Sequence, residues 1–593
     1  MVTVQSYGSY ENADQLENSG TKKVKRNCTS STTNDMIFWR FLRRRGFALA
    51  CKTVLGCSVV FITLQITSTF PRHPSKDHQM AVQANSVKNE EGVVDSEKSQ
   101  EFVAHQKEAK QAHKSGKLHD PKTQRRRENL FYENIIVHFD LKGAPPRVPY
   151  FLQLLDIVAQ SGATGVMIEW EDMFPWTGKL EVAKNTDAYS LEDVQEILTK
   201  ARDLNLDVIP LVQTFGHLEW ILKLEHFRKY RENDEYPQVL CVGDEEAVEI
   251  VKDALKQVID VHKSFGIKYF HIGSDEVFEF GVCPKSVEWI LKHSIDGDKQ
   301  LLAVSHMKDI ALFVKNLTDG ATVLAWHDML KGFDSRIIAS LQLGEVIELV
   351  IWDYSEHIVT MPDSSFSDLA LNFPVVWASS AYKGANFPSA KYIDIRHYEA
   401  NNLAWIDTKI AQEVKFANFR GIIITGWQRY DHMATICEIL PMGTPSMVLN
   451  VQIALMGAKK DPYVARQRAA KVLGCVYFSV HKLNIISNMC NFTGFTAYSL
   501  FQGSAQDTIS YINSELDRNH QLMGWLSPYN IRHNFTQNWN LKELKPFLEV
   551  LLEQILPIDR SLRKELSIYS SLALWMSLCP PQLLPSLIGY KVI

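Results

Sequence analysis

Short apolar runs alternate with longer amphipathic segments over the middle of the chain. The short runs resemble strands that are buried on both faces, and the longer segments repeat apolar residues at helical spacing. Eight runs are predicted to be strands: 133–142, 165–170, 207–213, 269–272, 321–326, 346–351, 373–377 and 421–425. Alternation of this kind over about 300 residues predicts an α/β fold, a (β/α)8 TIM barrel, rather than an open sheet. We assign this barrel to residues 131–450.

The helices between these strands include predicted segments at 150–161, 190–204, 244–264 and 300–317. Ser190 is followed three residues later by an aspartate, a pattern close to a capping box, and it marks the start of the second of these helices. No glycine-rich phosphate loop follows the first strand, which counts against a dinucleotide-binding fold.

The two ends of the chain follow different patterns. The polar residues 1–46 end in a cluster of arginines and precede the apolar run 47–70, which is long enough to span a bilayer. Residues 71–130 contain few large apolar side chains and are predicted to be a disordered stem. Beyond the barrel, residues 451–593 are predicted to form a helical extension.

The charges around the apolar run predict a membrane topology. Arginines precede it and few basic residues follow it, so we expect a retained signal anchor with a cytosolic N-terminus, which is type II topology. The expected location is the secretory pathway, in the Golgi or a related lumen, and a product without the anchor would be cytosolic. Sequons at Asn316, Asn491 and Asn534 agree with the secretory pathway. An amphipathic or buried helix at 47–70 remains the alternative.

The composition narrows the class of protein. The chain has 593 residues, of which 46% are hydrophobic and 22% charged, as in a globular protein with accessory segments. Its formal net charge of -5 is small and unpatterned, so no nucleic-acid partner is expected. The nine cysteines show no CxxC or Cys/His spacing, and we expect neither a metal site nor a cofactor. Disulfides would fit an oxidising lumen, but no pairing follows from the spacing.

Two adjacent carboxylates, Asp275 and Glu276, follow the fourth strand. Catalytic side chains of α/β barrels stand where strands give way to loops, because the backbone there is rigid and the side chain faces a cavity. Two carboxylates this close repel each other when both are charged, which pushes one toward the protonated form that acts as an acid near neutral pH. The pair is therefore a candidate acid site, and a pair that only caps the following loop is the alternative.

Aromatic and acidic residues recur at the other strand ends. Flat rings beside carboxylates suit a sugar, whose C–H faces stack on rings and whose hydroxyls donate to acids. The aromatic set is Trp170, Trp326, Trp352, Tyr354, Trp377, Tyr382 and Trp427, and the acidic set is Asp140, Glu169, Glu171, Asp328, Asp353 and Asp431. Core packing would explain any one of these tryptophans, so it is their recurrence that indicates a carbohydrate site.

Four short motifs at these strand ends resemble one known family. They are GSDEV at 273–277, FGH at 215–217, Phe174-Pro175 after Glu171-Asp172, and Gly426-Trp427 after the last strand. They are similar to motifs of the family-20 glycoside hydrolases, the β-N-acetylhexosaminidases, and in particular of their hexosaminidase D branch. Typical lysosomal members carry a small α/β domain before the barrel, and the predicted stem leaves no room for one here.

The resemblance implies an exo-β-N-acetylhexosaminidase that removes terminal non-reducing N-acetylgalactosamine or N-acetylglucosamine with retention. In such enzymes the 2-acetamido carbonyl of the sugar attacks its own anomeric carbon, so no enzyme nucleophile is needed. Glu276 would protonate the leaving oxygen and later activate water, while Asp275 would orient the acetamido N–H and stabilise the developing positive charge. His217, with Glu171 as its orienting partner, would hydrogen-bond Glu276.

The resemblance also implies which aromatic side chains contact the sugar. Tyr382 matches the tyrosine that donates to the acetamido oxygen. Trp326, Trp352 and Trp427 would enclose the acetamido methyl and the ring. These four residues are the expected aromatic contacts.

The residues that would hold the sugar hydroxyls depart from the lysosomal pattern. Lysosomal relatives have an arginine after the first strand and an acid after the tryptophan of the last, whereas this chain has Asp140 with Lys142, and Arg429. With Glu169 and Asp328, these residues are the remaining substrate-binding candidates. The departure leaves open which epimer, N-acetylgalactosamine or N-acetylglucosamine, is preferred.

Two alternatives to this activity share the barrel. A family-18 chitinase would share the barrel and the substrate assistance, but its DxxDxDxE strand is absent from the sequence. A catalytically silent carbohydrate-binding or scaffold protein on the same barrel stays open. The expected partners are a glycan or glycoconjugate substrate and the membrane, through one N-terminal span. Whether the chain forms a homodimer is left open.

Overall fold

The computed structural model describes residues 130–570, apart from residues 295, 477, 479, 482–483, 486–488, 526 and 536. The predicted cytosolic tail, membrane anchor and nearly all of the stem lie outside the described residues, as do residues 571–593 at the end of the predicted extension. Among the residues that are described, no helix combines the length and the apolar character that crossing a bilayer requires.

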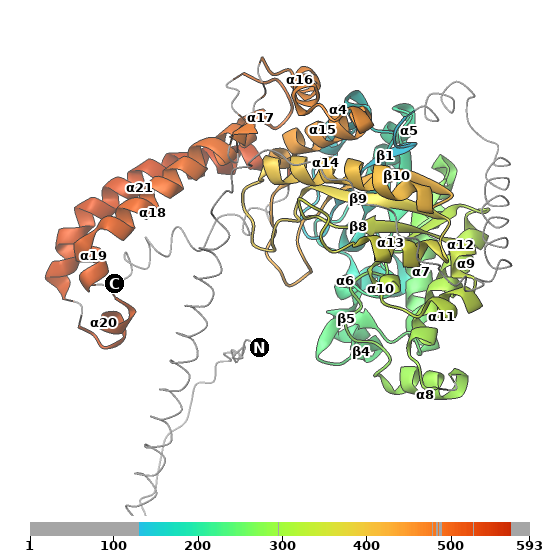
Figure 1. Ribbon diagram of the computed structural model, residues 1–593. Helices are drawn as coiled ribbons and strands as arrows, with labels where there is room; N and C mark the ends of the chain where they lie inside the picture. The colour runs from blue at the N-terminus through green and yellow to red at the C-terminus, as the bar shows by residue number, and fades with distance from the viewer. Residues whose placement is uncertain are drawn as a thin grey trace, which may run out of the picture. The chain divides into compact units, whose positions relative to one another are not determined.

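Eight parallel strands close into a barrel at the centre of the described chain (Figure 1). They are β1 (Asn134–Asp140), β2 (Gly165–Glu169), β3 (Asp207–Leu211), β6 (Tyr269–His271), β7 (Thr322–Trp326), β8 (Ile347–Trp352), β9 (Val375–Lys383) and β10 (Asn418–Gly426). The first strand pairs with both the second and the last, which closes the ring. The predicted (β/α)8 barrel is confirmed, and all its strands end on the same side.

Helices lie on the outside of the barrel, and most of them connect consecutive strands (Figure 1). The longest are α4 (Val148–Ser161), α5 (Leu191–Asp203), α7 (Glu245–His262), α9 (Gln300–Leu317), α14 (Ile395–Gln412) and α15 (Leu440–Met456). The start of α5 is a capping box, in which the Ser190 side chain accepts from the Asp193 N–H and the Asp193 side chain accepts from the Ser190 N–H, as its sequence predicts. Shorter helices, among them α8 (Pro284–His293) and α13 (Asp363–Ala370), fill the remaining connections.

The barrel differs from its predicted form in two places. β9 continues to Lys383, six residues beyond the predicted end, so the polar residues Ser379 and Ser380 lie within a strand. An antiparallel hairpin, β4 (Arg231–Asn233) and β5 (Tyr236–Leu240), stands in the long connection between β3 and α7. The apolar pattern predicts neither feature. Polar side chains of β9 can be buried in the closed barrel where they find hydrogen-bond partners.

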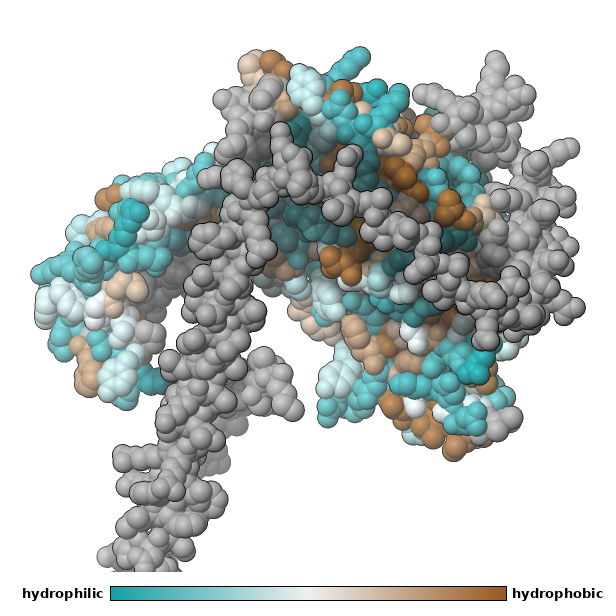
Figure 2. Space-filling model, in the orientation of Figure 1, coloured by the Kyte–Doolittle hydropathy of each residue, from teal (hydrophilic) through white to brown (hydrophobic). Residues whose placement is uncertain are grey.

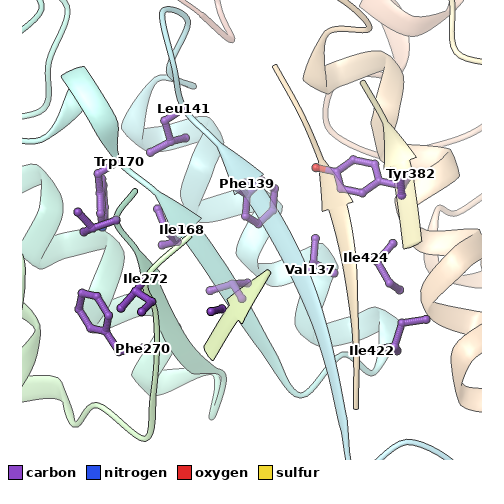
Figure 3. Packing of buried hydrophobic residues seen from close by; sticks show 14 of the residues in the cluster. Val137, Phe139, Leu141, Ile168, Trp170, Phe270, Ile272, Tyr382, Ile422 and Ile424 are labelled. Atoms are coloured by element: carbon purple, nitrogen blue, oxygen red, sulfur yellow. The ribbon is translucent and has the colours of Figure 1, made fainter. Parts of the chain in front are cut away.

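The hydrophobic core has two layers that follow the alternation of side chains along each strand. Ile136 points into the barrel, where it packs with residues such as Trp326 and Trp377. Its neighbours Val137 and Phe139 point outward, toward the helices. Figure 3 shows this outer layer. The same alternation turns His138, two residues after Ile136, toward the barrel interior, where its ring meets Trp427 edge to face.

The described part of the C-terminal extension is mainly helical, as its sequence predicts, with one short antiparallel strand pair, β11 (Val480–His481) and β12 (Asn484–Ile485). It contains α16 (Pro462–Val472), α17 (Phe495–Tyr498), α18 (Gln506–Arg518), α19 (His520–Trp525), α20 (Pro528–Arg532) and α21 (Asn538–Leu566). Leucines of α21 form an apolar cluster with Ile512 and Leu522. Just after α21, the chain contacts the loop before α4, where Arg147 Nε donates to the Ser567 carbonyl at 2.9 Å.

Two disulfides join cysteines of the described chain. Cys241 pairs with Cys283, and Cys475 with Cys490. Cys437 is buried and free. The first disulfide ties the end of the β4–β5 hairpin to the start of α8, on the same side of the barrel as the strand ends.

Candidate active site

A pocket opens at the carboxyl ends of the barrel strands. Its wall comes from the ends of seven of the eight strands and the segments that follow them: Lys142, Gln213, His217, Asp275, Glu276, Trp326, Trp352, Tyr354, residues 384–388, Trp427, Arg429 and Tyr430. The pocket therefore unites nine residues that the sequence points to for the site: Lys142, His217, Asp275, Glu276, Trp326, Trp352, Tyr354, Trp427 and Arg429. It also includes residues to which the sequence pattern gives no role, among them Tyr430 and the segment 384–388.

Asp275 and Glu276 stand in the pocket on a sharply bent backbone. Gly273, Ser274 and Glu276 all have positive φ values, of 64°, 73° and 47°. A non-glycine residue adopts this region only at a cost of about 1–3 kcal/mol, and such residues cluster at functional sites. A Cβ atom on Gly216 would lie 2.4 Å from the Asp275 carbonyl oxygen, so the loops after β3 and β6 are in close contact. The bend presents both carboxyl groups to the cavity.

His217 joins the two acids. Its Nε2 lies 3.2 Å from Glu276 Oε2 and 3.6 Å from Asp275 Oδ2. Burial disfavours the charged ring, but the Asp275 charge, the hydrogen bond to Glu276 and the charge of Glu219 together raise the pKa of His217 to about 10. Burial, followed by the charge of Glu276, raises the pKa of Asp275 despite the opposing effect of His217. The three groups thus form one coupled charge cluster.

The carboxylate near the second ring nitrogen of His217 is not the predicted one. Glu219, not Glu171, lies near the other ring nitrogen, with its Oε1 4.0 Å from His217 Nδ1. Glu171 is instead bound to His432, with 2.5 Å between Oε2 and Nε2. The reason is local geometry: Glu219 begins helix α6 (Glu219–Leu222) directly after the left-handed turn at His217. Burial raises the pKa of Glu219 to about 7.

Asp328 stands behind the acid rather than in the pocket wall. Its Oδ2 accepts the backbone N–H of Glu276 at 2.8 Å, and its Oδ1 accepts the indole N–H of Trp352 at 3.0 Å. Burial, followed by the charge of Asp275, raises the pKa of Asp328 to about 7. The predicted contact of Asp328 with sugar hydroxyls stays a prediction, since each of its oxygens accepts one hydrogen bond from the protein and can accept a second.

Four aromatic side chains form one side of the pocket. Trp352 and Tyr354 stack at 5.4 Å between ring centroids, and Trp427 lies 6.0 Å from Trp326. Trp427 donates its indole N–H to the Tyr354 hydroxyl at 3.1 Å. The three predicted tryptophans therefore line the pocket together, and Tyr354 connects two of them.

Tyr382 lies outside the pocket, so its assignment as a substrate contact is corrected. The side chain is fully buried, and its hydroxyl donates to the His138 carbonyl at 3.3 Å. The cause is the extra length of β9, which places Tyr382 in the strand on its outward face, among the residues of the outer core layer shown in Figure 3. A Cβ atom on Gly426 would lie 2.3 Å from the Tyr382 hydroxyl, so the ring fills the space that this glycine leaves. Two other tyrosines, Tyr354 and Tyr430, line the pocket, and both follow strand ends in the sequence.

The predicted acids at the ends of β1 and β2 surround Lys142 instead of the cavity. Lys142 Nζ lies 3.3 Å from Asp140, 3.5 Å from Glu171 and 3.9 Å from Glu169. Burial opposes the charge of Lys142, but these three acids hold its pKa well above the usual range. Burial raises the pKa of Glu169, which favours its neutral form. Of this group only Lys142 lines the pocket, where its Nζ lies 5.4 Å from the centre of the Trp427 ring.

Asp140 also forms a hydrogen bond to the loop after the last strand. Its Oδ2 accepts the backbone N–H of Gln428 at 2.7 Å, which joins the end of β1 to the loop after β10. Its other oxygen accepts the N–H of Lys142 at 2.9 Å. The predicted contact of Asp140 with substrate is therefore replaced by a structural bond beside Trp427.

Arg429 lines the pocket and is held by a buried histidine. Its Nη2 lies 2.7 Å from His432 Nδ1, and Lys223 Nζ lies 3.0 Å from the same nitrogen. Glu171, Asp172 and His432 come close enough together to be considered as metal ligands. The chemistry of their surroundings fits ion pairs better, because Lys142, Arg429 and Lys223 already contact Glu171 or His432.

Sequence comparisons with known proteins agree on one family. A family model described as "Glycosyl hydrolase family 20, catalytic domain" matches residues 150–380. Hexosaminidase D of Homo sapiens is 33% identical over 426 residues, which are 71% of this chain and 85% of the relative. Hexosaminidase D of Bos taurus is 37% identical over 333 residues, 56% of this chain and 94% of the relative. A solved β-N-acetylhexosaminidase from Bacteroides fragilis has a TM-score of 0.39 at 16% identity, over 64% of this chain and 72% of that structure.

Proposed function

The chain belongs to glycosyl hydrolase family 20, and on this premise we propose how its pocket acts as a β-N-acetylhexosaminidase. The substrate is a glycoconjugate with a terminal non-reducing β-linked N-acetylhexosamine. The observation that carries the proposal is the arrangement of Asp275, Glu276 and His217 within one aromatic pocket, with 3.2 Å between His217 Nε2 and the Glu276 carboxylate.

We assign the two carboxylates different steps of a retaining, substrate-assisted reaction. The acetamido carbonyl oxygen of the sugar forms a bond to the anomeric carbon while the bond from that carbon to the leaving oxygen breaks. Glu276 gives its proton to the leaving oxygen. In the second step the Glu276 carboxylate takes a proton from water as the water attacks the anomeric carbon and the oxazolinium ring opens. The product keeps the β configuration.

Asp275 stabilises the intermediate in this scheme. Its buried carboxylate accepts the acetamido N–H and faces the positive charge that develops on the oxazolinium ring. With both acids ionised and His217 protonated, the cluster carries a net charge of −1, so the cationic intermediate neutralises it. His217 positions both carboxylates and prevents their direct repulsion.

The aromatic side of the pocket holds the sugar. Trp326, Trp352 and Trp427 present rings to its C–H faces and to the acetamido methyl. The Tyr354 hydroxyl accepts a hydrogen bond from Trp427, which leaves its own proton for the acetamido oxygen. Lys142 and Arg429 supply donors for the ring hydroxyls, in place of the arginine and acid of lysosomal relatives.

Hydrolysis of aryl β-N-acetylgalactosaminide and β-N-acetylglucosaminide by the full chain tests the proposal. The comparison is with Glu276→Gln and Asp275→Asn, and each should lower the rate by about two to four orders of magnitude. Glu279→Gln is the matched control, because Glu279 lies on the same loop outside the pocket, where it accepts from Asn233 at 2.8 Å. The ratio of the two wild-type rates gives the preferred epimer. A folded wild type that cleaves neither sugar, or acid variants that match it, would support the silent carbohydrate-binding alternative instead.

We also propose a single-pass type II membrane protein of the secretory pathway, with the barrel in the lumen. The arginines before residues 47–70 support this topology, and the disulfides Cys241–Cys283 and Cys475–Cys490 suit an oxidising compartment. Protease protection of the barrel in sealed microsomes tests it, and cleavage without detergent would contradict it. The homodimer remains a prediction that light scattering of the solubilised chain can check.

A further inference from the structure

Two buried polar side chains stand behind the arginine of the pocket. On the face shown in Figure 2, hydrophilic residues cover much of the surface, where water solvates their charges. Glu171 and His432 lie below the surface instead, since their side chains are 2% and 0% exposed. Neither residue lines the pocket, but His432 contacts Arg429, which does. Buried polar groups need protein partners, so these contacts fix the side chains in place.

The two ring nitrogens of His432 have opposite roles. Nδ1 lies 2.7 Å from Arg429 Nη2 and 3.0 Å from Lys223 Nζ, and both of these groups can only donate. Nδ1 therefore accepts, which leaves the ring proton on Nε2. This N–H donates to Glu171 Oε2 at 2.5 Å, while the Asp172 carboxylate lies 3.9 Å from Nδ1. One tautomer of the ring thus satisfies its hydrogen-bond partners.

Glu171 holds the ring from its far side. Burial disfavours the charged form of Glu171, but the charge of Lys142 and the contact with His432 lower its pKa. A charged acceptor makes the stronger hydrogen bond, and a histidine that is held at one nitrogen presents the other nitrogen in a fixed direction. The Glu171 carboxylate therefore orients Nδ1 of His432 toward the arginine.

The guanidinium of Arg429 is confined on a second side. A Cβ atom on Gly143 would lie 2.7 Å from Arg429 Cζ, so the guanidinium lies directly against this glycine. Arg429 Nε is buried and has no hydrogen-bond partner in the part of the chain that the structure describes. A guanidinium carries five N–H donors, so donors remain for a ligand in the pocket.

We propose that His432, oriented by Glu171, is a positioning residue that holds Arg429 toward the hydroxyls of the bound sugar. The proposal rests on the proposed function, in which Arg429 supplies donors to those hydroxyls. A free arginine loses rotamer entropy when it binds a ligand, and the contacts with His432 and Gly143 remove that cost in advance. His432 therefore raises the affinity for a hydroxyl that it does not itself touch.

Substrates that lack one hydroxyl test this role in the full chain. The set is the aryl β-N-acetylhexosaminide of the preferred epimer and its 3-deoxy, 4-deoxy and 6-deoxy forms. His432→Gln keeps a donor for Glu171 but removes the acceptor at Nδ1, so it should raise KM for the parent substrate about 5- to 20-fold and change kcat less than about threefold. On the deoxy form that lacks the hydroxyl bound by Arg429, its effect on KM should fall below about twofold. Arg429→Met identifies that form, because its own effect on KM should vanish there.

Three further variants separate positioning from a structural role. His432→Asn places its amide oxygen near the position of Nδ1 and should bring KM to within about threefold of wild type. His262→Gln is the matched control, because His262 is also buried but accepts the indole N–H of Trp170 at 3.2 Å away from the pocket wall, and it should leave KM unchanged. Should His432→Gln fail to fold, Glu171→Gln takes its place and should raise KM with the same dependence on one hydroxyl.

Two results would overturn the positioning role of His432. One is an equal change of KM on all the substrates, and the other is no change on any of them. A wild type that cleaves none of the substrates would instead refute the proposed function, which is a distinguishable result.

Discussion

The carboxylate of Asp328 accepts the backbone N–H of Glu276 at 2.8 Å. Its second oxygen accepts the indole N–H of Trp352 at 3.0 Å, so one partly buried side chain fixes both the acid and part of the sugar wall. Glu276 has a φ of 47°, and a residue in this left-handed region needs such support from its surroundings. Asp328 is therefore a positioning residue for the acid.

Asp328→Asn should lower kcat by about 10- to 100-fold on a substrate with a poor leaving group. The amide has one acceptor oxygen, so it must place its NH2 against one of the two N–H donors. The loss should shrink on an activated aryl substrate, which needs less protonation by Glu276. Trp352→Phe, which removes the indole N–H and keeps a ring, separates the two bonds. An equal loss on both substrates would argue that Asp328 affects binding and not the acid.

Tyr354→Phe should lower activity, whereas Tyr382→Phe should lower stability. The first removes a hydroxyl from the pocket and should lower kcat/KM by about 10²-fold, because a donor to the acetamido oxygen is lost. The second removes a buried hydroxyl that bonds the His138 carbonyl, so it should leave kcat/KM near wild type and lower stability by about 1 kcal/mol. Steady-state kinetics and chemical denaturation of both variants measure these effects. Reversal of the two kinetic results would restore Tyr382 to the site.

Lys142→Met should destabilise the fold by about 3–5 kcal/mol. The substitution leaves Asp140 and Glu171 buried at the strand ends without their shared cation. Lys200→Met is the matched control, because Lys200 pairs with Asp156 at the surface and such pairs contribute about 0–1 kcal/mol. Urea denaturation of the two variants compares the losses. Similar values would show that the buried acids find other partners.

The raised pKa of His217 predicts that the stability of the fold depends on pH. Because its pKa is raised from 6.5 in the unfolded chain to about 10 in the folded one, its contribution is complete below about pH 6.5 and is lost as the pH rises toward 10. The difference in melting temperature between wild type and His217→Gln should therefore be largest near pH 6 and narrow between pH 7 and 10. A gap that widens with pH would show that the histidine is neutral in the folded protein.

The sequence alone determined the barrel and the position of the acid pair. Each strand is an apolar run whose periodicity shows in the chain itself, and a parallel barrel brings all strand ends to one side, so Asp275, Glu276 and the tryptophans at strand ends could be placed together. His217 could be added because it also follows a strand.

Only the tertiary structure decided which polar side chains face the cavity. Asp140, Glu169 and Glu171 also stand at strand ends, but they surround Lys142, because buried charges must be paired. This pairing depends on distances between neighbouring strand ends, which no local pattern sets. Tyr382 faces the outer core because β9 is longer than its apolar run, and a shift of one residue in a strand reverses the face of its side chain. Phe387 reaches the pocket through contacts of its loop with Glu438 and Tyr398, residues that no local pattern connects to it.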